Sequence, residues 1–146
     1  MESRTEPVTR SQALGKIIVT GQQVFRLVTR LVRRYELTES QYNALRILRG
    51  AERREERLTQ AELAERLIAS RANTTWILDK LEERKLVQRK EHNDRRKNIV
   101  EITAAGQKLL ARIDPEWEAM LDTFMGEVSS EDLRQLAAIL NKFRFN

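Results

Sequence analysis

The chain has 146 residues and a formal net charge of +5, a length in the usual range of a single domain. Hydrophobic residues make up 40% and charged residues 34%, with only five glycines and two prolines, so we expect a mainly helical globular protein. No cysteine is present, which excludes disulfides and cysteine-bound zinc within this chain. The polar start and the lack of a long apolar run lead us to expect a cytoplasmic protein that does not contact the membrane.

Positive charge is concentrated in the middle of the chain. Residues 85–97 contain six basic and two acidic side chains, whereas residues 110–146 contain four basic and seven acidic ones. A basic segment suits a polyanionic partner such as nucleic acid, although the charge alone would also fit a membrane surface.

The N-terminal third predicts two helices. Residues 1–10 show no periodicity and are expected to form a flexible arm, and apolar residues recur at helical spacing over residues 11–34. A capping box at Thr38 to Gln41 starts a second helix, which Gly50 is expected to stop. The charged residues 51–57 then form a solvated connection or extend that helix.

Two short helices and a hairpin follow. A capping box at Thr59 to Glu62 opens the first helix, and Ser70 is the expected N-cap of the second, whose buried stripe is Thr74, Ile77, Leu78 and Leu81. Two such helices separated by a tight turn form a helix-turn-helix. Strand-like runs at residues 86–89 and 98–102 flank a turn-prone segment and predict a β-hairpin in the position of a wing. Residues 35–102 would thus form a winged helix-turn-helix core.

The C-terminal region, residues 103–146, predicts two further helices. Thr103 caps a long one that Pro115 should kink or divide, and Ser129 or Ser130 caps the last. The apolar stripes from Leu14 to Val32 and from Leu133 to Phe143 could not all be covered in so small a monomer. We therefore expect both terminal regions to bind a second copy of the chain.

The helix after Ser70 is the candidate for reading the major groove of DNA. Arginine can bond guanine, asparagine can bond adenine, threonine can contact a thymine methyl or a phosphate, and lysine can bind a phosphate. A solvated helix face is the competing interpretation, but an outward tryptophan needs a partner. The candidate residues are Ser70, Arg71, Asn73, Thr75, Trp76 and Lys80.

The hairpin supplies further candidates for DNA binding: Arg89, Arg95, Arg96 and Lys97. A run of cations is usually a solvated loop, but its place directly after a helix-turn-helix favours a wing that enters the minor groove. Asp94 would orient Arg96 or cap the turn.

Enzymatic functions have little support in the sequence. His92 is the only histidine, which excludes a catalytic histidine pair and a multi-histidine metal site. The glutamates near residues 52–56 and 82–83 alternate with basic residues, as on solvent-facing helices. We expect a protein that is not an enzyme and that needs no metal or cofactor.

The order of motifs from Leu58 to Gly106 resembles the core of the MarR family of regulators. The resemblance is carried by the Leu-Thr-Gln-Ala-Glu-Leu-Ala segment from Leu58, Ser70 with the helix to Leu81, Leu86 to Arg89, Asp94 to Arg96, Ile102-Thr103 and Gly106. One departure is Lys85, where the family usually has glycine. A left-handed backbone there would cost on the order of 1 kcal/mol.

The resemblance implies an α+β, mainly α fold, in which a winged helix-turn-helix core carries long N- and C-terminal dimerisation helices. It also implies a homodimer on a pseudo-palindromic DNA operator, acting as a transcription repressor that a small-molecule effector releases. The effector pocket would be lined by Tyr35, Tyr42, Trp117 and Phe124, although aromatic residues at helical spacing are more often core.

Two other functions remain open at this point. The protein could be a sequence-tolerant architectural DNA binder, or its winged helix could bind other proteins. The polar character of Arg71, Asn73 and Lys80 disfavours the second alternative. The sequence does not identify the operator, the effector or the regulated genes, and it does not distinguish a repressor from an activator.

Overall fold

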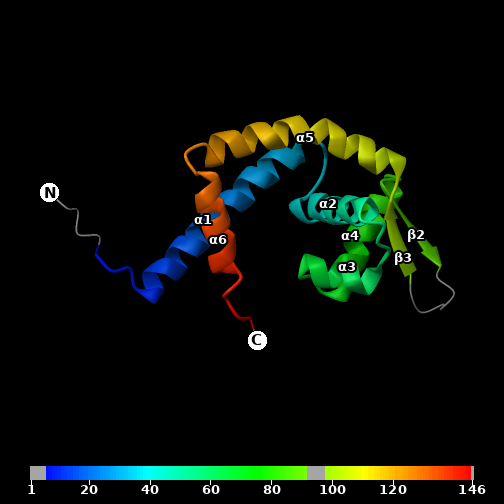
Figure 1. The fold of residues 1–146 in the computed structure, drawn as a ribbon. Helices are drawn as coiled ribbons and strands as arrows, with labels where there is room; N and C mark the ends of the chain where they lie inside the picture. The colour runs from blue at the N-terminus through cyan, green and yellow to red at the C-terminus, as the bar shows by residue number, and fades with distance from the viewer. Residues whose placement is uncertain (1–5, 92–97, 146) are drawn as a thin grey trace. The chain divides into compact units, whose positions relative to one another are not determined.

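The computed structural model describes residues 6–91 and 98–145 and divides the chain into two compact units, Met1–Ile113 and Asp114–Asn146 (Figure 1). It confirms the mainly helical α+β fold expected from the sequence. The elements in chain order are α1 (Arg10–Arg33), α2 (Glu39–Arg53), β1 (Leu58–Thr59), α3 (Gln60–Leu67), α4 (Arg71–Glu83), β2 (Val87–Glu91), β3 (Asn98–Ile102), α5 (Ala104–Met125) and α6 (Ser130–Leu140).

The expected N-caps start the helices where the sequence places them. Thr38, Thr59 and Ser129 each accept a hydrogen bond from the backbone N–H three residues on, and each belongs to a capping box. The same device operates at Thr9, where Gln12 completes the box and α1 begins at Arg10. Helix α1 therefore begins one residue before the predicted range 11–34, at the position that this capping box sets.

Helix α2 does not stop at Gly50, which corrects the sequence prediction. It continues to Arg53, and this extension buries Ala51, whose side chain is 3% exposed. Burying an apolar residue on the core side of the helix offsets the weak helix propensity of one glycine, about 1 kcal/mol. Helix α5 likewise runs through Pro115 without being divided.

A three-stranded antiparallel sheet closes the first unit, with the strand order β1-β3-β2. Strands β2 and β3 are the predicted hairpin and pair from Val87 with Ile102 to Glu91 with Asn98. The short β1, which the sequence analysis missed, pairs Leu58 with Val100 on the other side of β3. Figure 1 shows α2, α3 and α4 gathered beside this sheet.

The core of the first unit is built from one face of each of its elements. Helix α4 contributes the predicted stripe of Thr74, Ile77, Leu78 and Leu81, all at most 1% exposed. The core also takes side chains from α2, the sheet and the start of α5; its largest fully buried members include Tyr42, Leu45, Leu63, Val100, Leu110 and Ile113.

Gly106 marks the tightest backbone approach in this unit. The predicted cap Thr103 accepts a hydrogen bond from the Gly106 N–H at 3.1 Å and donates one to the carbonyl of Lys85 at 2.7 Å. This arrangement brings the first turn of α5 so close to Leu86 that a Cβ on Gly106 would lie 2.4 Å from the Leu86 carbonyl oxygen. No residue other than glycine fits there without a backbone shift.

Replacing Gly106 by alanine should therefore destabilise the protein. We expect the Gly106→Ala variant to lose about 1–3 kcal/mol of unfolding free energy, because a backbone carbonyl cannot rotate away as a side chain can. Gly15→Ala is the matched control, since a Cβ added at Gly15 in α1 would meet nothing within 4 Å and alanine is the better helix former. Urea denaturation at one protein concentration compares the unfolding free energies of the two variants. Equal values would contradict the close backbone approach assigned to Gly106.

Candidate nucleic-acid interface

The buried stripe of α4 decides which side chains the helix presents outward. Ser70 caps the helix by accepting the Asn73 N–H at 3.1 Å, and the buried Thr74 donates its hydroxyl to the Ser70 carbonyl at 2.9 Å. The predicted residues Arg71, Asn73, Thr75, Trp76 and Lys80 lie outside this stripe, and all of them are exposed. The predicted residues of this helix thus all project into solvent, and we call these five outward side chains the α4 face.

The members of the α4 face differ in what they already bind. The Thr75 hydroxyl accepts a hydrogen bond from the Gln60 amide at 2.7 Å and donates one to the Arg71 carbonyl at 3.0 Å. Lys80 pairs with Glu83 at 3.6 Å in an exposed contact. Among the described residues, the side chains of Arg71 and Asn73 form no hydrogen bond or ion pair. Their polar groups are therefore available to a ligand.

Trp76 adds apolar area to the same face. Its side chain is 50% exposed, whereas the apolar residues Ile77 and Leu78 next to it in sequence are buried. A half-exposed indole beside uncommitted polar groups is typical of a binding surface. Gln60, the first residue of α3, borders this face through its bond to Thr75 and was missed by the sequence analysis.

Arg89 connects the β2–β3 hairpin to α4. Its guanidinium donates to Asp79 and to Glu82, each at 2.6 Å, and its side chain is 23% exposed. Burial of the guanidinium opposes its charge, but the bonds to Asp79 and Glu82 outweigh that cost and raise the pKa of Arg89. In this structure the predicted DNA ligand Arg89 is thus engaged by two carboxylates of α4.

The second wing strand carries a similar ion pair. Lys90 lies 2.8 Å from Glu101 across the hairpin, and this bond lowers the pKa of the Glu101 carboxyl. The predicted wing-tip residues Arg95, Arg96 and Lys97, and Asp94 beside them, lie outside the described residues. The chain segment that holds them joins the paired ends of β2 and β3 at Glu91 and Asn98.

Lys85, which stands where the resemblance places a glycine, adopts a left-handed conformation between α4 and β2. Its φ angle is 59°, and its N–H donates to the Glu82 carbonyl at 2.8 Å. Ile68, in the turn between α3 and α4, is also left-handed at φ 52° and is 95% exposed. Both turns that hold the recognition helix thus contain strained residues where glycine would relax the backbone.

The two units carry net charges of opposite sign. The first carries 24 basic and 15 acidic residues, a net charge of +9, and the second carries three basic and seven acidic residues, a net charge of −4. The positive potential therefore belongs to the unit that contains the α4 face, as expected of a surface that meets phosphates.

The aromatic residues suggested for an effector pocket are divided between the units. Tyr42 is 2% exposed and belongs to the core of the first unit, while the Tyr35 ring lies under the Arg112 guanidinium at 5.6 Å. Trp117 is half-buried and Phe124 is 37% exposed, both in the second unit.

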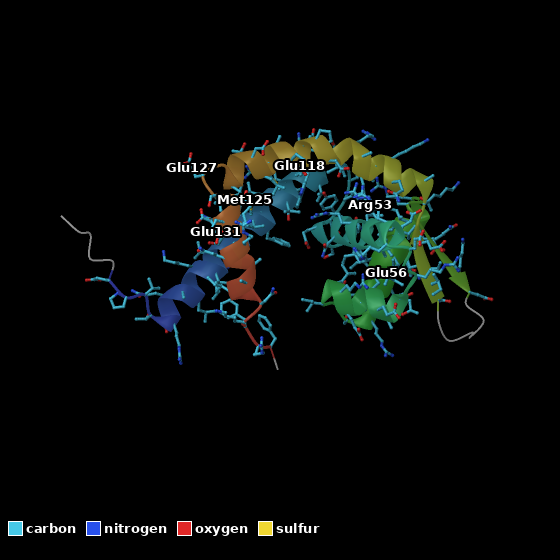
Figure 2. The ribbon with its side chains drawn as sticks, viewed as in Figure 1. Arg53, Glu56, Glu118, Met125, Glu127 and Glu131 are labelled. Carbon is cyan, nitrogen blue, oxygen red and sulfur yellow. The ribbon has the colours of Figure 1, made fainter. Side chains whose placement is uncertain are left out.

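Glutamates line one of the hollows in the first unit. One of about 410 Å³ lies between the end of α2 and the sheet and is lined in part by Glu52, Glu56 and Glu101. Glu56, labelled in Figure 2, is bound by Arg54 at 2.7 Å and Arg66 at 2.8 Å, and these bonds lower its pKa. In residues 6–91 and 98–145, no group of three acidic or histidine side chains could hold a metal ion, and no helix is long and apolar enough to span a membrane.

Comparison with known proteins agrees with this architecture. The model of the MarR family matches residues 37–98. The homoprotocatechuate degradative operon repressor of Escherichia coli is 32% identical over 114 residues, which cover 77% of this chain and 74% of the repressor. The transcriptional regulator HosA of Escherichia coli is 29% identical over 109 residues, which cover 73% of this chain and 77% of HosA.

Solved structures share the fold over nearly the whole chain. AbsC from Streptomyces coelicolor superposes with a TM-score of 0.80 at 21% identity, covering 93% of both chains. The S. aureus MepR–DNA complex superposes with a TM-score of 0.74 at 22% identity, covering 92% of this chain and 93% of MepR. Helix α4 is thus the second helix of a winged helix-turn-helix, and the chain belongs to the MarR family of transcriptional regulators.

Proposed function

We propose that this regulator reads a pseudo-palindromic DNA site as a homodimer, with the α4 face of each copy in the major groove. The observation that carries the proposal is the α4 face itself, where the exposed side chains of Arg71 and Asn73 have no partner among the described residues. Arginine and asparagine are the residue types that bond guanine and adenine through two hydrogen bonds. The MepR structure, a complex with DNA, supports this assignment by its shared fold.

Dimerisation is supported by apolar side chains that the chain does not cover. In α1, Leu14, Ile18 and Phe25 are 51–57% exposed, and in α6 no residue is buried at all. The exposed apolar residues of α6 are Leu133, Leu136, Ile139 and Leu140, which repeat at helical spacing. A second copy is the occupant we propose, because two recognition helices about 34 Å apart read two half-sites one helical turn apart.

Repression is the proposed outcome of binding, supported by the relative named as an operon repressor. We also propose that a small-molecule effector releases the DNA. A sequence-tolerant architectural binder is the competing function, and it differs in showing no preference among DNA sequences. A protein-interaction module is less consistent with an α4 face that carries Arg71, Asn73 and Lys80.

The dimer interface can be tested on α6. Leu136→Asp places a charge on the exposed apolar face and should convert the dimer to a monomer, because a buried unpaired carboxylate costs several kcal/mol. Ala138→Asp puts the same residue on the polar side of the same helix and should leave the dimer intact. Sedimentation equilibrium gives the masses. A Leu136→Asp variant that remains as dimeric as the Ala138→Asp variant would place the interface elsewhere.

Sequence reading can be tested at Asn73. Because its side chain has no partner among the described residues, Asn73→Ala should leave folding unchanged. It should cost about 1–3 kcal/mol on a duplex selected from a random pool by the wild-type protein, and much less on random DNA.

Lys80→Ala is the control for this experiment. Loss of a phosphate contact should weaken binding to both duplexes alike and lower the slope of log affinity against log salt by about one. Fluorescence anisotropy titrations at several salt concentrations measure both variants. Equal losses on the two duplexes for Asn73→Ala would remove Asn73 from base reading.

A further inference from the structure

The exit from α1 is tied to the far end of the recognition helix. After α1 ends at Arg33, the chain turns through Glu36, whose φ angle is 56°. Arg84, the C-cap of α4, reaches this turn from 48 residues away in sequence. Its Nη1 donates to the Glu36 carbonyl at 2.8 Å and its Nη2 to the Tyr35 carbonyl at 3.2 Å. One guanidinium thus joins two helices that otherwise both pack on α2.

A third helix meets the same turn. The Tyr35 hydroxyl donates a long hydrogen bond of 3.5 Å to the Arg112 carbonyl in α5, and the Arg112 guanidinium lies 5.6 Å from the centroid of the Tyr35 ring. A cation at that distance over an aromatic face is attracted by it. The Tyr35–Glu36 turn therefore has direct contacts to α1, α4 and α5, and Arg84 makes the contact to α4.

The geometry differs from ordinary helix capping. An arginine near a helix C-terminus commonly binds the last carbonyls of its own helix. Arg84 instead binds two successive carbonyls of another segment with both terminal nitrogens of a rigid planar group, which fixes direction as well as distance. Its side chain is exposed, so these bonds contribute little burial and their main effect is orientation.

We propose that Arg84 is a positioning residue for DNA binding, which holds the recognition helix at a fixed angle to the end of α1. This inference rests on the proposed function, in which α1 takes part in the dimer and two recognition helices bind one palindrome. A loosened helix still docks on one half-site. When one helix is bound, however, the recognition helix of the second copy is no longer held at a defined distance from the second half-site. The effective concentration for the second contact therefore falls.

The test compares full palindromes with half-sites. Wild-type protein, Arg84→Ala and Arg84→Gln are titrated against the selected palindrome, a single half-site, and palindromes with one base pair added or removed at the centre. For Arg84→Ala we expect about a tenfold or greater loss on the palindrome, a loss of about twofold or less on the half-site, and a weaker penalty for altered spacing. Arg84→Gln retains a side chain that can bond one carbonyl and should fall between wild type and Arg84→Ala.

Arg53→Ala is the control for the lost positive charge. Arg53 is an exposed arginine in the last turn of α2, labelled in Figure 2, and its removal should weaken binding to palindrome and half-site by the same factor with the spacing penalty unchanged. Thermal melts check that each variant is folded. We expect the Arg84 variants to fold, because the Arg84 side chain is exposed.

Two different failures can be told apart. If wild-type protein binds palindrome and half-site equally, the proposed dimeric reading of DNA is wrong. If wild-type protein prefers the palindrome and penalises altered spacing, and Arg84→Ala does so to the same degree, then Arg84 does not position the recognition helix and this inference is overturned.

Discussion

The burial of one face of α4 is the constraint on which the site depends. Ile77, Leu78 and Leu81 are at most 1% exposed, and truncating any one of them to alanine would cost about 2–5 kcal/mol. No rotation of the helix about its axis is compatible with keeping these side chains buried. Arg71 and Asn73, which lie outside this stripe, are therefore exposed before any ligand is bound.

Polar contacts join exposed side chains of α4 to the neighbouring elements. Arg89 fastens β2 to Asp79 and Glu82, and Gln60 of α3 binds Thr75. Because Arg89 pairs with the carboxylates of Asp79 and Glu82, these two groups repel phosphates less. The net charge of +9 on the first unit then dominates the potential that DNA meets.

Much of the fold could be predicted from local sequence because its signals are local. The capping boxes at Thr38 and Thr59, the Ser70 cap and the four-residue stripe of α4 each depend on residues within a few positions of one another. The left-handed backbone of Lys85 agrees with the glycine that the MarR family usually has at this position. The wrong prediction that α2 stops at Gly50 has a related origin. The burial of Ala51 in the core, which favours continuing the helix, is a tertiary contact that local sequence does not show.

The tertiary pairings of the site could not be predicted. Arg89 has the same character in the sequence as the other cations of residues 85–97, and only the folded chain brings it between Asp79 and Glu82. Arg84 and the Tyr35–Glu36 turn are 48 residues apart, and no sequence pattern links an arginine to a particular backbone carbonyl. Local patterns thus predicted the outward residues of α4, whereas the contacts among the side chains around them required the structure.

The central claim is that the α4 face distinguishes DNA sequences. The most direct measurement is the ratio of wild-type affinities for the selected palindrome and for random duplex of equal length, at one physiological salt concentration. A sequence-reading regulator should show a ratio of about a thousandfold or more. A ratio near one across a range of salt concentrations would show that only phosphates are bound, and would make the protein an architectural DNA binder instead.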